Sequence, residues 1–322
     1  MTAIIGDMIS IIVPVFNEEE SLPAFFAEVL RVLPTLDKEY EMLFIDDGST
    51  DASLLTLQSF AKDNHHVRIF SFRRNLGKAE ALTLGFQKAK GDYLVTLDAD
   101  LQDKPTEIHK LLARAKEGVE VVCGWRKDRK DKSKMKIISK VFNWVVGKMF
   151  DLRLHDYNCG LKVYTSDAAK SLRLYGGMHR FIPFLASEQG FSVDEVAIEH
   201  AQRKFGTSKY GFSKVWKDLP DLFSMFFLAK YSKRPLHFFG VIGVTFFLIG
   251  FLFLSYLTFL HYAFGESVGT RPILFVGIMF IISGFQIFFT GFLADLMLSI
   301  AHTSELSDEK GPKFPLKYTS DK

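Results

Sequence analysis

Two carboxylates and an amide stand at alternate positions where an apolar run ends, in the sequence VTLDADLQDKP (residues 95–105). Successive side chains of an extended chain point to opposite sides, so Asp98, Asp100 and Gln102 would share one side. Carboxylate and amide oxygens suit Mg²⁺ or Mn²⁺, and such ions commonly keep waters and bridge to substrate phosphates. The alternative is that the two aspartates cap a helix that begins near Pro105.

Two other apolar runs also end in polar side chains. IIVPVFNEEE ends in Asn17 and Glu18, and LFIDDGSTD ends in Asp46 and Asp47. Each has a purely structural alternative, because Asn17 can be a turn residue and Asp47 can form an Asx-turn beside Gly48.

The alternation of these runs with helical patterns predicts how their ends are arranged. The helical patterns cover residues 21–33, 50–61 and 75–90, with Ser49 or Thr50 as the N-cap of the second. This order is typical of an α/β fold with a mostly parallel sheet. Ligands of such sheets bind at the carboxyl ends of the strands, where we expect the polar clusters to lie.

Several classes of site are excluded by the motifs that the sequence lacks. It contains no Gly-x-Gly-x-x-Gly, no phosphate-binding Gly-x-x-x-x-Gly-Lys-Ser/Thr, no His/Cys group with zinc spacing and no Gly-x-Ser-x-Gly. The net charge of +3 gives no support for nucleic-acid binding. The class of site that remains is a metal–phosphate site in which side chains hold the nucleotide.

The C-terminal part of the chain predicts a membrane anchor. The segments His237–Leu260 and Ile273–Ala294 contain no Asp, Glu, Lys or Arg, and about 20 apolar residues suffice for a helix to cross a bilayer. Lys230, Lys233 and Arg234 precede the first segment, while the connecting loop has Arg271. The positive-inside rule therefore predicts a multi-pass plasma-membrane protein whose catalytic domain and both termini are cytoplasmic.

The remaining segments complete a predicted domain plan. Residues 126–140 and 213–230 combine basic and apolar side chains, typical either of solvated helices or of interfacial helices on anionic lipid. The polar tail is expected to be mobile. The N-terminus lacks the positive region of a secretory signal, so the two cysteines are expected to be reduced. The predicted parts are a cytosolic domain, a juxtamembrane segment, two membrane helices and a tail, at residues 1–212, 213–235, 236–300 and 301–322.

Five motifs in order, followed by two membrane helices, resemble one enzyme family. The motifs are IIVPVFNEEESL, FIDDGSTD, NLGKAEAL, DADLQDKP and RKFGTSKYG. Together they are similar to the polyprenyl-phosphate glycosyltransferases of glycosyltransferase family 2, in particular the bacterial O-antigen glucosylation and aminoarabinose-transferase branch. The dolichol-phosphate mannose synthases are more distant. The resemblance implies a GT-A (Rossmann-like) fold with interfacial helices and two transmembrane helices.

The resemblance also implies roles for individual residues. The nucleotide-sugar would contact Pro14, Asn17, Glu18, Asp46, Asp47, Lys78 and Asp98. The metal would bind Asp98, Asp100 and Gln102. Asp98, Asp100 and Asp156 would be catalytic, with Asp156, in the HDYNCG motif, acting as a base or positioning a group.

Basic residues are required by the charges of the implied substrates. A lipid phosphate and a nucleoside diphosphate repel each other, by about 4 kcal/mol for two unit charges at about 4 Å and an effective dielectric of about 20. The candidates that would offset this repulsion are Arg126, Arg129, Arg203 and Lys209, for each of which the alternative is a solvated surface charge.

The implied reaction is the inverting transfer of a hexosyl unit from a UDP-sugar, with UDP-glucose favoured, to polyprenyl phosphate. Packing between membrane helices would also favour self-association as a homo-oligomer. Two alternatives stay open: a processive family 2 polysaccharide synthase, which would carry Gln-x-x-Arg-Trp and more membrane helices, and a catalytically silent membrane partner.

Overall fold

The computed structural model divides the chain into two compact units, one formed by residues 1–221 with 313–322 and the other by residues 222–312. It describes residues 8–36, 38–127, 152, 154–201, 227, 231, 234–269, 271–305 and 316–320. Both predicted interfacial stretches lie almost entirely outside the described residues.

The first unit is built on an eight-stranded mixed sheet with the order β7-β5-β6-β4-β1-β2-β3-β8. Parallel pairs join β1 to β2 and β4, β2 to β3, and β5 to β7, while β6 and β8 run antiparallel to their neighbours. The predicted mostly parallel sheet is thus confirmed. The strands are β1 (Ile9–Val15), β2 (Tyr40–Asp46), β3 (Val67–Phe72), β4 (Tyr93–Thr96), β5 (Val121–Arg126), β6 (Lys162–Thr165), β7 (Val193–Ile198) and β8 (Leu316–Thr319).

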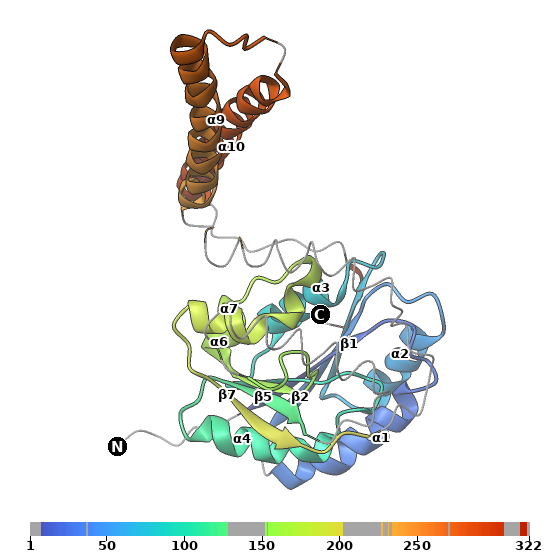
Figure 1. Ribbon diagram of the computed structural model, residues 1–322. Coiled ribbons are helices and arrows are strands. Elements are labelled where there is room, and N and C mark those ends of the chain that lie inside the picture. The colour runs from blue at the N-terminus through green and yellow to red at the C-terminus, as the bar shows by residue number, and fades with distance from the viewer. Residues whose placement is uncertain are drawn as a thin grey trace. The chain divides into compact units, whose positions relative to one another are not determined.

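Helices cover both faces of this sheet (Figure 1). One face packs against α1 (Leu22–Val32), α2 (Ser53–Asp63) and α4 (Ile108–Lys116), and the other against α3 (Lys78–Lys88), α6 (Ser166–Ser171) and α7 (Ile182–Glu188). Three 3₁₀ turns connect these elements: η1 (Leu33–Leu36), η2 (Pro105–Glu107) and η3 (Gly176–Arg180).

Strand β1 shows how the sequence produces these two buried faces. Its residues alternate, so that Ile11 and Val13 join the core beneath α1 and α2, while Ile12 points toward α3. A Cβ at Gly85 of α3 would lie 2.4 Å from Ile12 Cγ2, so only glycine lets this helix approach so closely. A strand buried on both faces reads as a continuous apolar run, as β1 does.

The predicted N-cap of the second helix is wrong. The helix begins at Ser53, and the residue before it is Ala52, which offers no side-chain cap. Ser49 Oγ instead accepts the backbone N–H of Asn17 at 3.0 Å, and the N–H of Ser53 donates to Asp51 Oδ1 at 2.9 Å. The Ser49 hydroxyl therefore links the loop that follows β2 to the loop that follows β1.

The polar C-terminal tail contains a strand that the sequence analysis did not predict. Residues 316–319 form β8, which pairs antiparallel with β3 at the edge of the sheet. The backbone N–H of Ile69 donates to Ser320 Oγ at 2.7 Å, and the N–H of Ser320 donates to the Ile69 carbonyl at 2.9 Å. The expectation of a mobile tail is wrong for these residues. Their pairing with β3 provides partners for backbone N–H and C=O groups at the edge of the sheet.

The second unit contains two long apolar helices, α9 (Pro235–Phe264) and α10 (Pro272–Glu305). Both are long and apolar enough to cross a membrane, as predicted for the two apolar segments. Phenylalanines and leucines occupy much of the exposed surface, whereas Gly243, Gly250, Gly277 and Gly284 lie between the helices. Small residues at such interfaces allow close backbone approach, which is what stabilises helix pairs in lipid.

We predict that Gly284→Ala destabilises this hairpin. A Cβ at this position would lie 2.7 Å from the Gly243 carbonyl oxygen and 2.7 Å from the Phe247 nitrogen, so the helices must separate. Overpacking of this kind typically costs about 1–3 kcal/mol, against an intrinsic helix preference for alanine of about 1 kcal/mol. The melting temperature in detergent micelles should fall.

Gly240→Ala is the matched control in the same hairpin. The atoms nearest to its added Cβ lie 3.9 and 4.0 Å away, which is ordinary contact. This variant should melt at or above the temperature of the wild-type protein. Equal melting temperatures for the two variants would show that the glycine contacts do not hold the helices together.

Candidate active site

A cavity of about 220 Å³ lies where β1, β2 and β4 end. Acidic side chains from all three strand ends face it together with the first residue of α3. The expectation that the polar clusters meet at the carboxyl ends of the strands is therefore confirmed. The described residues that line the cavity are Pro14, Val15, Phe16, Glu18, Asp47, Lys78, Asp98, Ala99 and Asp100.

Asp98 is held between a cation and a glycine. Lys78 Nζ lies 2.5 Å from Asp98 Oδ1, and both side chains are about one-third exposed, at 34%. On the other side, a Cβ at Gly160 would come within 2.6 Å of Asp98 Oδ2. The position of the carboxylate therefore depends on Gly160 having no side chain.

Asp98 and Asp100 face the same space, as predicted, but the predicted reason, alternation along an extended strand, is wrong. Strand β4 ends at Thr96, and the chain then turns, with Leu101 in the left-handed region at a φ of 57°. The Gln102 N–H donates to Asp100 Oδ1 at 3.2 Å, as in an Asx-turn. Asp98 and Asp100 line the same cavity although both lie beyond the strand, with the chain turning at Ala99 and Asp100, so alternation along an extended chain is not the reason. Gln102 is not among the residues that line it.

The residues present fit a divalent cation that is bound together with a diphosphate. Asp98 and Asp100 line one cavity, and Asp98 already faces the positive charge of Lys78. Within the described residues no group of three or more His, Cys, Asp or Glu is arranged to enclose a metal ion. Mg²⁺ and similar ions at nucleotide sites usually take one or two carboxylates from the protein and the other ligands from phosphates and water.

The two aspartates after β2 differ in their surroundings. Asp46 is buried, and its oxygens accept the Ser49 N–H at 3.1 Å and the Ser71 hydroxyl at 2.6 Å. Asp47 lines the cavity and accepts the N–H groups of Leu76 and Gly77. Burial raises the pKa of Asp47, although these backbone bonds oppose the shift. Asp47 therefore fixes the turn from which Lys78 projects.

The residues after β1 are likewise partly structural. Asn17 has a φ of 54°, and its Oδ1 accepts the Thr50 N–H at 2.8 Å, so it joins two loops outside the cavity lining. Glu18 lines the cavity and accepts the Ser21 hydroxyl at 2.7 Å. Pro14 contributes an apolar wall.

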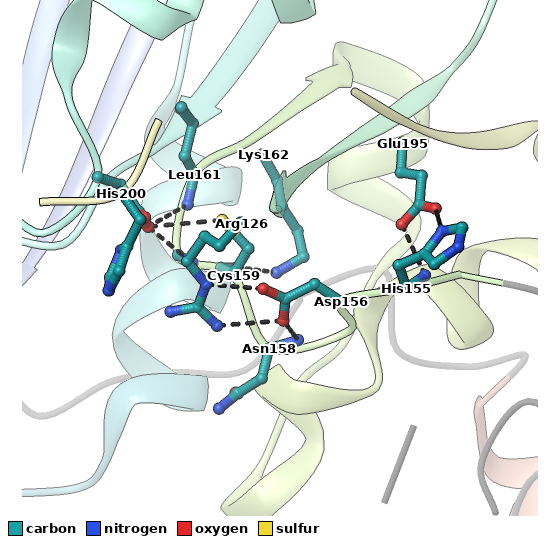
Figure 2. Close-up of polar contacts among 11 residues, drawn as sticks. Arg126, His155, Asp156, Asn158, Cys159, Leu161, Lys162, Glu195 and His200 are labelled. Carbon is teal, nitrogen blue, oxygen red and sulfur yellow. Dashed lines mark hydrogen bonds and ion pairs between the residues drawn. The ribbon is translucent and has the colours of Figure 1, made fainter. Parts of the chain in front are cut away.

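Asp156 and Arg126, which the sequence analysis assigned to separate roles, form a buried ion pair (Figure 2). Arg126 Nε donates to Asp156 Oδ2 at 2.7 Å, and Nη2 donates to Oδ1 at 3.1 Å. Burial by itself would lower the pKa of Arg126, but the carboxylates of Asp156 and Asp103 raise it. A carboxylate held on both oxygens in this way is suited to positioning rather than to proton abstraction.

Asp103 was not assigned a role from the sequence, yet it is a centre of the local structure. Its Oδ2 accepts the N–H groups of Gly160 and Leu161, both at 3.2 Å, and the Cys159 thiol at 3.5 Å. Burial by itself would raise its pKa, but the His200 imidazole, 3.7 Å away, and the charge of Arg126 lower it to about 2. The one feature of the sequence that could have pointed to this role is that Asp103 is the third aspartate of DADLQD.

Three of the predicted phosphate-binding residues cannot be placed. Arg129, Arg203 and Lys209 lie outside the described residues. Their assigned roles remain predictions.

Comparison with known proteins identifies relatives over most of the chain. The profile of Glycosyl transferase family 2 matches residues 10–169. The dodecaprenyl-phosphate galacturonate synthase of Rhizobium johnstonii is 35% identical over 93% of this chain and 90% of its own length. The undecaprenyl-phosphate 4-deoxy-4-formamido-L-arabinose transferase of Proteus mirabilis is 34% identical over 89% of this chain and 87% of its own.

Solved structures support the same fold. The glucosyl-3-phosphoglycerate synthase of Mycobacterium tuberculosis, in complex with Mn²⁺ and uridine-diphosphate-glucose, superposes with a TM-score of 0.55 at 17% identity. The match covers 70% of this chain and 79% of that one. At this identity the likeness concerns the fold alone.

We predict that neither cysteine reacts while the protein is folded. Burial raises the pKa of Cys123 to about 12 and that of Cys159 well above its ordinary value, so both thiols stay protonated at pH 8. Because the thiolate is the reactive form, a disulfide reagent at pH 8 should label the native protein at neither site and the denatured protein at both. Rapid labelling of Cys159 in the native protein would contradict this structure of the site.

Proposed function

The chain belongs to the polyprenyl-phosphate glycosyltransferases of glycosyl transferase family 2, and from this we propose that it transfers a sugar from a nucleoside-diphosphate donor to a polyprenyl phosphate at the membrane surface. The observation that carries the proposal is the cavity in which Asp98, Asp100 and Lys78 meet at the carboxyl end of the sheet. The two apolar helices would anchor this site beside its lipid substrate.

The donor would be held by the residues that line the cavity. Glu18 and Asp47, which line the cavity, would contact the nucleoside, and Asp98 and Asp100 would hold Mg²⁺ or Mn²⁺ beside the diphosphate, with Gln102 as a further proposed ligand. The metal, when bound, would neutralise the charge of the leaving diphosphate. Lys78, a cation 2.5 Å from Asp98, would add a second positive charge. Asp46 and Asn17, which are engaged with neighbouring loops, would act by shaping this pocket.

The acceptor phosphate would attack the anomeric carbon directly. One of its oxygens forms the new bond to carbon, the bond from carbon to the diphosphate oxygen breaks, and the nucleoside diphosphate leaves with that electron pair. Attack opposite the leaving group inverts the anomeric centre. The phosphate oxygen is already ionised near neutral pH, since the second pKa of a phosphate monoester is about 6. Asp156, bonded to Arg126, would therefore orient groups rather than accept a proton.

The names of the relatives bear on which sugar is transferred. The family resemblance of the sequence favours UDP-glucose, but the relatives are named for galacturonate and 4-deoxy-4-formamido-L-arabinose. We therefore propose a UDP-linked sugar, with these two as candidates beside glucose.

The position of β8 supports a common side of the bilayer for both flanks of the membrane helices. The strands that β8 completes precede α9 in the chain, whereas β8 itself follows α10. A tail that pairs with β3 must lie on the same side of the bilayer as the sheet. The distribution of Lys and Arg favours the cytoplasmic side of the plasma membrane.

We predict that the purified full-length protein forms a glycolipid from undecaprenyl phosphate when a divalent cation and the correct donor are present. Donors should include UDP-glucose, UDP-galacturonate and UDP-4-deoxy-4-formamido-L-arabinose, and release of UDP should depend on the acceptor. Chelation with EDTA should stop the reaction, and added Mn²⁺ or Mg²⁺ should restore it. Absence of product with every donor would reject the proposed function.

We also predict that Asp100→Asn lowers kcat by about 100-fold, because loss of electrostatic stabilisation at a reacting centre typically has this effect. The protein should remain folded, with a melting temperature near that of the wild type. Asp63→Asn, at the exposed end of α2, is the control and should retain full activity. Normal turnover in Asp100→Asn would remove Asp100 from the metal site.

A further inference from the structure

The segment of residues 155–161, hereafter the Asp156 segment, joins two sides of the site. It carries Asp156, the partner of Arg126, and Gly160, which packs directly against the Asp98 carboxylate. Within the segment the Asn158 N–H donates to Asp156 Oδ1 at 3.1 Å. Any movement of the segment would therefore change the surroundings of both Asp156 and Asp98.

Glu195 of β7 holds the beginning of this segment through two hydrogen bonds to one residue. The His155 backbone N–H donates to Glu195 Oε2 at 2.7 Å, and the His155 ring nitrogen Nδ1 contacts Oε1 (Figure 2). The same ring stacks on Trp125 of β5, with centroids 4.1 Å apart and planes 16° from parallel. The Glu195 side chain is 10% exposed.

Asp103 holds the end of the segment. Its Oδ2 accepts the N–H groups of Gly160 and Leu161, and Thr96 donates its hydroxyl to the Gly160 carbonyl at 2.8 Å. Asp103 lies in the same short turn region as Asp98 and Asp100. The end of the segment is thus attached to the chain that carries the proposed metal ligands.

We propose that Glu195 and Asp103 are positioning residues that fix the two ends of the Asp156 segment, so that Asp156 faces the acceptor while Gly160 supports Asp98 on the donor side. The inference rests on the proposed glycosyl transfer and assigns roles to two carboxylates to which the sequence analysis gave none. Glu195 acts on the acceptor side alone, because its contacts are to His155. Asp103 acts on both sides, because it joins Gly160 to the acidic turn.

The charges explain why carboxylates hold these ends. Bonds from backbone N–H groups to an ionised oxygen are stronger than those to a neutral acceptor. Asp194, the adjacent residue of β7, uses its carboxylate differently: Oδ2 accepts from Arg114 Nε at 2.7 Å, and Oδ1 accepts the Glu195 N–H at 2.8 Å. Asp194 therefore provides a matched control.

The first experiment measures steady-state kinetics of the full-length protein with undecaprenyl phosphate and its active UDP-sugar. Glu195→Ala should lower kcat/KM for the acceptor about tenfold, in line with the loss of charged hydrogen bonds, and should leave the KM of the donor unchanged. Asp103→Asn should raise the KM of the donor as well as that of the acceptor. Asp194→Ala should change neither constant.

The outcomes separate positioning from a general structural role. A Glu195→Ala variant with wild-type acceptor kinetics would overturn the proposal, as would one in which donor and acceptor constants change equally. His155→Ala combined with Glu195→Ala should show less than the sum of the two single effects, because both changes release the same end of the segment. Additive effects would also contradict the proposal.

The second experiment does not depend on activity. Hydrogen exchange resolved to single amides should become about tenfold faster at His155 in Glu195→Ala, with Leu161 unchanged. Asp103→Asn should give the reverse pattern, faster at Gly160 and Leu161 and unchanged at His155. Unaltered exchange in both variants would overturn the inference even if the wild-type protein is an active transferase. If the protein shows the expected exchange pattern but no transferase activity, the proposed function is rejected. The inference that Glu195 and Asp103 fix the two ends of the Asp156 segment would stand.

Discussion

The concentration of negative charge at one end of a parallel sheet is the constraint on which the rest of this structure depends. Like charges in a partly buried site disfavour ionisation, so each carboxylate requires a donor or a cation nearby. The molecule meets this need in different ways: backbone N–H groups for Asp47 and Asp103, a hydroxyl and a backbone N–H for Asp46, Lys78 for Asp98, and Arg126 for Asp156. Loops, turns and helix starts around the cavity are arranged to supply these partners.

The kind of partner distinguishes the acidic residues by role. A carboxylate whose oxygens accept backbone N–H groups fixes the chain, as Asp103 does when it holds Gly160 and Leu161. Asp98 differs from these residues, because its carboxylate lines the cavity and its partner there is the Lys78 ammonium group. The functional centre is therefore supported by aspartates that look alike in the sequence but act as parts of the scaffold.

The glycines show the same dependence on close approach in both units. Gly160 lets a loop pack against Asp98, and Gly85 lets α3 pack against β1. In the apolar hairpin, Gly243 and Gly284 bring backbone against backbone, so dispersion contacts replace the hydrophobic driving force that lipid does not provide. In the first unit β8 closes the edge of the sheet with residues that follow the hairpin, so this unit is built from segments on both sides of the apolar helices.

The sequence by itself determined the alternating α/β order, the meeting of polar clusters at the carboxyl ends of the strands, and the two apolar helices. These features follow from local periodicity and composition. The sequence also pointed to Asp98, Asp100 and Lys78, which come together in one cavity. Only the tertiary structure decided that the chain leaves β4 before Asp98 and turns at Ala99 and Asp100, so that strand alternation does not place the aspartates, and that Asp156 binds Arg126. The same holds for Asp103 and Glu195 at the ends of one segment and for β8 beside β3. These contacts join residues distant in the chain, and no local pattern of side chains encodes which distant partner a carboxylate or a strand edge will meet.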